Sequence, residues 1–202
     1  MSKTLALLCA VAIGSGAIAK TNEPRGGEVR GKAGIYLSEL AINPPGTDNT
    51  LEYIEIVGPP DTPMAGMYLV VIEGDGGGAG TIDQVIPLTG AIGSNGVYLL
   101  RDSTLVLQPP PPPETTVVVR DFAPDLENGA TTIVLGMATG SLPPAGTDLD
   151  ADNDGVIDVE FPLDVIDAVS YQDNVTGGTQ YAAGLGGTNL GSFTTFTPGM
   201  LY

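Results

Sequence analysis

Residues 37–60 read LSELAINPPGTDNTLEYIEIVGPP, two short runs of branched and aromatic side chains separated by a turn rich in proline and glycine. Side chains of this kind favour the pleated surface of a β-sheet. The segments 43–46 (Asn-Pro-Pro-Gly) and 58–61 (Gly-Pro-Pro-Asp) restrict φ and remove amide donors, so each should end a strand sharply. This stretch therefore predicts two β-strands joined by a short loop.

The same pattern recurs along most of the chain. Successive runs lie about ten to fifteen residues apart, and no segment shows the apolar period of a helix, which is typical of an all-β sandwich or barrel. The content of 29 glycines and 17 prolines agrees with many turns. The expected strands lie within residues 34–42, 51–58, 67–74, 82–88, 96–102, 115–122, 131–137 and 164–171.

The opening stretch resembles the lamin tail domain, in which a strand of the form "ISEI" leads through an Asn-Pro turn to "EYIEI". The matching positions are Leu37, Ser38, Glu39, Asn43, Pro44, Glu52, Tyr53, Ile54 and Glu55. The resemblance extends over residues 35–198, including GMYLVVIEGDG, NGVYLLRD, DFAPDLENGATTIVL and GTDLDADNDGVIDVEFPLDVIDAVSY. It implies an immunoglobulin-like antiparallel β-sandwich over residues 35–202 that serves as an interaction or structural module.

The first residues, 1–19, have the layout of a secretory signal peptide. A basic start at Lys3 is followed by a short apolar run and by the small-residue ending Ala17-Ile18-Ala19, after which we expect cleavage. Cys9 lies inside the apolar run, where it does not suit lipid attachment. Residues 20–34 are polar and rich in glycine and are expected to form a flexible leader. Because of the signal peptide, the chain is predicted to be secreted and extracellular.

Composition excludes several kinds of chemistry. The chain has no histidine, and its one cysteine, Cys9, lies in the predicted signal peptide, so zinc, haem and iron–sulfur sites are not expected. After residue 34 the only basic residues are Arg101 and Arg120, against 22 acidic ones. Such a surface should repel nucleic acid and anionic membranes, which are bound through clustered cations. The expected partner is an extracellular protein or a cell surface.

Residues 148–158, DLDADNDGVID, form the most specific motif in the sequence. Asp150, Asp152 and Asp154 fit positions 1, 3 and 5 of a calcium loop, Gly155 fits the tight turn, Val156 would offer its carbonyl, and Asp158 follows at position 9. Phe161 stands where a bidentate glutamate closes the helix–loop–helix form. The motif predicts Ca²⁺ bound in a β-protein loop; the alternative is a solvated acidic hairpin without an ion.

Two further motifs suggest function without completing a site. The glycine-rich segment 74–80, GDGGGAG, is followed by neither Lys-Ser/Thr nor a helix, so it is not expected to bind phosphate. Glu39, Glu52 and Glu55 could suggest a carboxylate catalytic cluster, but no histidine, cysteine or lysine accompanies them. We therefore predict a non-catalytic module ordered by Ca²⁺. The alternative is a carboxylate-metal-dependent hydrolase of the phosphoesterase or nuclease-associated kind.

Overall fold

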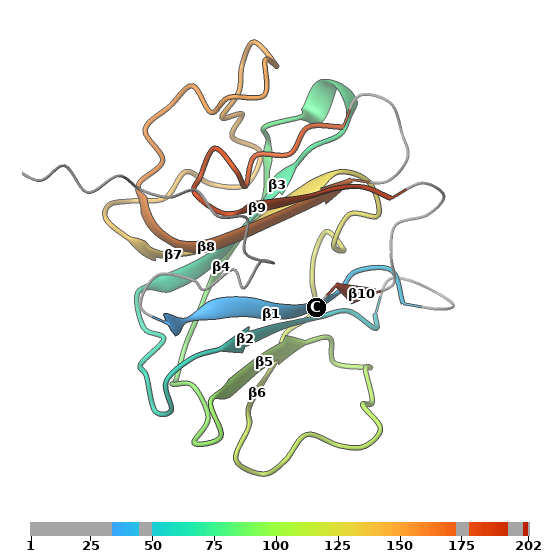
Figure 1. The fold of residues 1–202 in the computed structure, drawn as a ribbon, viewed down its shortest axis with the longest axis vertical. Helices are drawn as coiled ribbons and strands as arrows, with labels where there is room; N and C mark the ends of the chain where they lie inside the picture. Colours follow the sequence, from blue (N-terminus) through green and yellow to red (C-terminus); the bar gives the residue numbers. More distant parts are fainter. Residues whose placement is uncertain (1–33, 45–49, 173–177, 194–199, 202) are drawn as a thin grey trace, which may run out of the picture.

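The computed structural model describes residues 34–44, 50–172, 178–193 and 200–201 and contains two five-stranded sheets packed face to face (Figure 1). The predicted signal peptide and all of the leader except Gly34 lie outside the described residues. The first sheet has the order β10-β1-β2-β5-β6 and the second the order β4-β3-β7-β8-β9. The strands are β1 (Tyr36–Ala41), β2 (Tyr53–Val57), β3 (Met67–Glu73), β4 (Ile82–Pro87), β5 (Val97–Arg101), β6 (Thr116–Val119), β7 (Thr131–Ala138), β8 (Leu163–Gln172), β9 (Thr188–Ser192) and β10 (Met200–Leu201).

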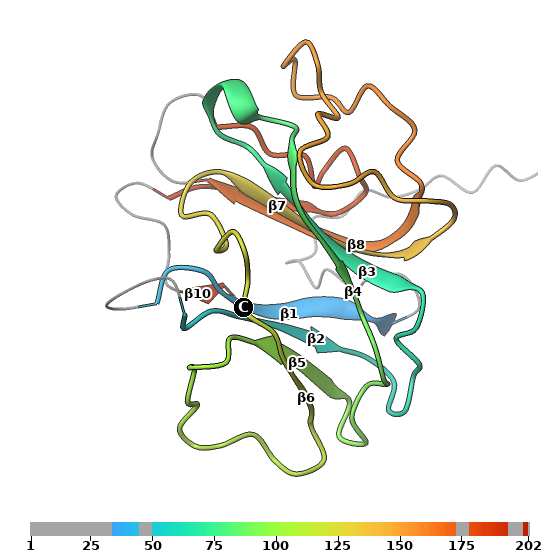
Figure 2. The ribbon, with the colours of Figure 1, turned by 180° about the vertical axis from the view of Figure 1, so that it is seen from behind.

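The predicted β-sandwich is confirmed, but two pairs of strands are parallel rather than antiparallel. Both sheets are mixed, because β6 runs parallel to β5 and β9 runs parallel to β8. Parallel neighbours need a long crossover, and residues 102–115, which include the five prolines at 109–113, provide it between β5 and β6 (Figure 2). The expectation of a wholly antiparallel sandwich did not allow for this crossover.

The main core lies between the two sheets, and a second core covers the outer face of the second sheet. Strand β3 contributes to both, since Leu69 and Val71 face the first sheet while Val70 and Ile72 face outward. Burying a side chain of this size stabilises the fold by about 1.5–3 kcal/mol. A strand buried on both faces explains why 67–73 reads as an almost continuous apolar run.

The second core positions the loops of interest. Leu149, from the connection between β7 and β8, and Tyr181, from the segment before β9, belong to the same buried cluster as Val70 and Ile72. Leu149 is fully buried and Tyr181 is 2% exposed. The acidic loop that follows Leu149 is therefore fixed to the outer face of the second sheet.

Candidate metal centre

The acidic loop is anchored to the start of β4. The amide of Ile82 donates to the carbonyl of Thr147 at 2.9 Å, and the amide of Leu149 donates to the carbonyl of Gly80 at 3.0 Å. The loop and the glycine-rich turn between β3 and β4 consequently occupy the same end of the molecule, the orange and green segments at the top of Figure 1. This turn contains a short 3-10 helix at Gly76–Gly78 and leads into a strand, unlike a phosphate-binding loop.

Gly80 permits the close approach of the loop. Its φ is +87°, and a Cβ at this position would lie 2.6 Å from the Cβ of Asp150 and 2.9 Å from the amide nitrogen of Asp150. Any side chain at residue 80 would therefore both strain the backbone and displace Asp150. The glycine-rich segment makes room for the acidic loop.

Left-handed residues and one closing hydrogen bond shape the loop itself. Asn153 has φ 55° and Gly155 has φ 87°, and residues of these two types adopt this region most easily. The amide of Asn153 donates to the carbonyl of Asp150 at 3.1 Å. The amide of Asp158 donates to the carbonyl of Leu149 at 2.7 Å, which joins the two ends of the loop.

The carboxylate of Asp150 lies at the centre of the loop and is fully buried. Its Oδ1 accepts a hydrogen bond from the amide of Asp154 at 3.1 Å. Its Oδ2 accepts one from the amide of Gly155 at 3.0 Å and a second from the hydroxyl of Tyr181 at 2.8 Å. Burial acts to raise the pKa of Asp150, but these hydrogen bonds outweigh it and lower the pKa. Asp150 is thus held as a carboxylate.

Three of the four predicted aspartate ligands come together. Asp150, Asp152 and Asp158 each offer a carboxylate oxygen, and these oxygens lie within 4.8 Å of one another. Asp154 lies outside this group, and its Oδ1 accepts a hydrogen bond from the amide of Val156 at 2.9 Å. The side chain of Val156 is 61% exposed, as suits a position where only a carbonyl is required.

The charges of the loop repel one another in the arrangement that the structure shows. The nearby charge of Asp154 raises the pKa of Asp152, with further contributions from burial and from the charges of Asp158 and Asp150. Burial, together with the hydrogen bond to the charged Asp150, raises the pKa of Tyr181. A cation between the three carboxylates would remove this repulsion, and oxygen ligands alone suit a hard cation.

Tyr181 and Gly80 were missed by the sequence reasoning. Tyr181 lies 31 positions after Asp150 in the segment TQYAAGLGG, which has no strand period and no charge. Gly80 could be read only as one of several turn glycines. No local pattern in the sequence connects either residue to the acidic loop.

The acids of the suspected catalytic cluster make structural hydrogen bonds. Glu52 is fully buried, and its Oε2 accepts the amide of Leu126 at 2.9 Å. Glu55 accepts the hydroxyl of Ser38 at 2.6 Å, and Glu39 accepts the hydroxyl of Tyr53 at 2.8 Å. Glu39 and Glu55 therefore tie β1 to β2, and Glu52 holds the connection between β6 and β7.

Comparisons with protein-family models, with curated proteins and with solved structures give no match to this chain. The resemblance to the lamin tail domain therefore stays a prediction. No helix in the described part of the chain is long and apolar enough to cross a membrane. Fold and site together define a class: an all-β sandwich carrying an acidic loop that could hold a metal ion.

Proposed function

We propose that this protein is a secreted, non-catalytic interaction module, of the lamin tail type, whose acidic loop is ordered by Ca²⁺. The observation that carries the proposal is the convergence of Asp150, Asp152 and Asp158 around a buried, hydrogen-bonded carboxylate. Ca²⁺ takes six to eight oxygen ligands at flexible geometry, so three aspartates, loop carbonyls and water suit it better than Mg²⁺, which demands a near-ideal octahedron.

The surroundings of the loop support a structural role for the ion. Asp150 receives its hydrogen bonds from two loop amides and Tyr181, groups that hold a carboxylate in place. A hydrolase would need a general base or a phosphate-binding cation beside the metal. The guanidinium of Arg101 instead donates hydrogen bonds to the carbonyls of Asp102 and Leu105, both at 2.7 Å.

Calorimetric titration with Ca²⁺ and with Mg²⁺, combined with thermal unfolding, tests this function. An ion that binds only the folded chain stabilises it by about 2.7 kcal/mol at a hundredfold excess over Kd. We expect a higher melting temperature in millimolar Ca²⁺ than in chelator and a smaller effect of Mg²⁺. Equal melting temperatures in chelator and in Ca²⁺ would show that the loop is a solvated hairpin.

Two variants test whether the calcium response comes from the acidic loop. Asp152→Asn removes a ligand charge without changing side-chain shape and should abolish the calcium effect. Asp61→Asn is the matched control, because Asp61 is an exposed acid in a distant turn. Asparagine rather than alanine is needed there, since Asp61 has φ 60° and asparagine tolerates this conformation. A calcium response that survives in Asp152→Asn would place the ion elsewhere.

A further inference from the structure

The outer edge of β1 is only partly covered. Strand β10 pairs with Leu40 and Ala41, and no described strand pairs with residues 36–39 on this side. The amide of Leu37 instead donates to Oδ2 of Asp167 on β8 at 2.8 Å. A side chain thus takes the place of a neighbouring strand at this point, and no described strand pairs with the rest of residues 36–39 on this side.

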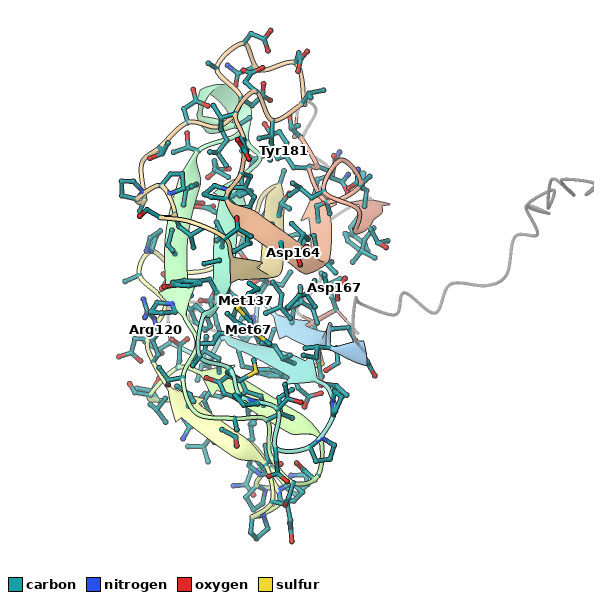
Figure 3. The ribbon with its side chains drawn as sticks, turned by 90° about the vertical axis from the view of Figure 1, so that its left-hand side faces the viewer. Met67, Arg120, Met137, Asp164, Asp167 and Tyr181 are labelled. Carbon is teal, nitrogen blue, oxygen red and sulfur yellow. The ribbon has the colours of Figure 1, made fainter. Side chains whose placement is uncertain are left out.

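A cavity of about 260 Å³ opens beside this edge, between β1 and the strands β8 and β9. Its lining combines apolar and acidic side chains, and Figure 3 shows Asp167 where β8 approaches β1. Leu190, which is 43% exposed, belongs to the apolar part. The lining includes Leu40, Leu190, Leu201, Glu39 and Asp167.

The cavity carries negative charge that no described cation balances. Asp167 is only 5% exposed, and burial raises its pKa although the amides of Leu37 and Ala168 donate to it. Neither Arg101 nor Arg120 lines the cavity, and these are the only basic residues in the described part of the chain. Glu39, fixed by Tyr53, adds a second carboxylate. A positively charged group would complete the site.

We infer that this edge binds an extended basic peptide of a partner protein, which adds a strand to β1 and places a lysine or arginine side chain against Asp167 and Glu39. Strand addition combines main-chain hydrogen bonds with pockets for alternate side chains. The apolar lining, Leu40, Leu190 and Leu201, would take the neighbouring side chain. The inference names the partner class for the interaction role proposed above, and it does not depend on the metal.

Charge distinguishes this occupant from a second copy of the chain. The formal net charge of the protein is −17, so two copies repel each other, whereas a basic segment is attracted and steered to the site. A neutral strand would leave Asp167 without a counter-charge. The observations therefore favour a basic partner.

The test measures fluorescence anisotropy of a labelled short peptide of alternating lysine and valine added to the full chain. We expect binding that weakens with salt and that Asp167→Asn weakens by about tenfold, or about 1.4 kcal/mol. The side-chain oxygen of asparagine can still accept a hydrogen bond from the amide of Leu37. Asp164→Asn is the matched control, because Asp164 is an exposed acid on the same strand outside the cavity and should leave affinity within about twofold.

A second variant and several control peptides distinguish this inference from its alternatives. Glu39→Gln should also weaken binding, which provides a second variant if Asp167→Asn fails to fold. A peptide of alternating glutamate and valine that binds equally well would overturn the inference. So would undiminished binding of a lysine–valine peptide with methylated backbone nitrogens, or sedimentation showing a dimer that Asp167→Asn dissociates. Loss of peptide binding with an intact calcium response would overturn this inference alone.

Discussion

Two groups of acidic side chains near the same end of the second sheet differ in how their charge is accommodated. In the acidic loop, hydrogen bonds from two amides and a tyrosine lower the pKa of Asp150 despite its burial. At the start of β4, burial and the charges of Glu73 and Glu127 raise the pKa of Asp83 to about 7. Among the described groups, none donates a hydrogen bond to Oδ2 of Asp83, and that atom is buried.

Between these two carboxylates, hydrogen-bond donors rather than the number of neighbouring acids decide which one stays charged. Asp150 is surrounded by more aspartates than Asp83 and is nevertheless the stronger acid of the two. Asp150 is held as a charged, pre-positioned carboxylate, while Asp83 takes up a proton near neutral pH. Single substitutions can change one side of this comparison at a time.

The largest effect is expected from Gly80→Ala. The new Cβ would overlap Asp150, and alanine at φ +87° is strained, so we expect a loss of about 2–4 kcal/mol in the free energy of unfolding. Urea denaturation measures the loss, and calorimetry should show a weaker calcium response. Gly77→Ala is the control, because no atom lies within 4 Å of a Cβ at residue 77. Equal stability of the two variants would contradict the close approach.

Tyr181→Phe removes one donor from Asp150 and keeps the aromatic packing. Hydrogen bonds to charged groups contribute about 1.5–3 kcal/mol, so we expect a loss of roughly 2 kcal/mol in chelator. Thermal unfolding measures it. Tyr68→Phe, which changes a tyrosine on the same outer core, should have little effect. If both variants melt alike, the Tyr181 hydroxyl does not hold the loop.

Asp83→Asn should stabilise the protein at neutral pH by about 1 kcal/mol, because asparagine carries no charge to bury and solvent already screens part of the charge of Asp83. The folded pKa lies above the unfolded value of 3.8, so protonation of Asp83 favours the folded state. The stability from this group is complete below about pH 4 and is lost as the pH rises through about 7. Melting temperatures across this window should fall less steeply in Asp83→Asn, and an unchanged slope would contradict the assignment.

The smallest effect is expected from Asp152→Asn in chelator. Removing one charge relieves repulsion with Asp154 and Asp158, so the melting temperature should rise slightly. In Ca²⁺ the same substitution should lower it relative to wild type, because a ligand is lost. This reversal of sign distinguishes a metal loop from a solvated one, and an equal shift under both conditions would contradict it.

The strands that make up most of the fold could be predicted from the sequence. All eight expected runs contain or overlap the observed strands β1 to β8, because branched and aromatic side chains mark each one. Strands β9 and β10 were missed. Strand β9, TNLGS, has no buried residue and no apolar alternation, and it pairs with the edge of β8. The parallel pairings depend on long-range packing that short runs do not encode.

The candidate site could be predicted only in its local part. The spacing of Asp150, Asp152 and Asp158 is a local signal, and the structure brings these three together. The contributions of Tyr181 and Gly80 come from segments that meet Asp150 only after the outer core has formed. The spacing of the aspartates also does not predict that the carboxylate of Asp154 accepts a hydrogen bond from the amide of Val156.

The hydrogen bond between Asp158 and Leu149 makes the acidic loop a candidate for transplantation. Its two ends meet as the arms of a hairpin do, so residues 149–158 could be grafted into a surface turn of another β-protein without separating the flanking strands. The recipient would have to supply two features from its own scaffold. One is a glycine opposite Asp150, and the other is a hydroxyl in the place of Tyr181.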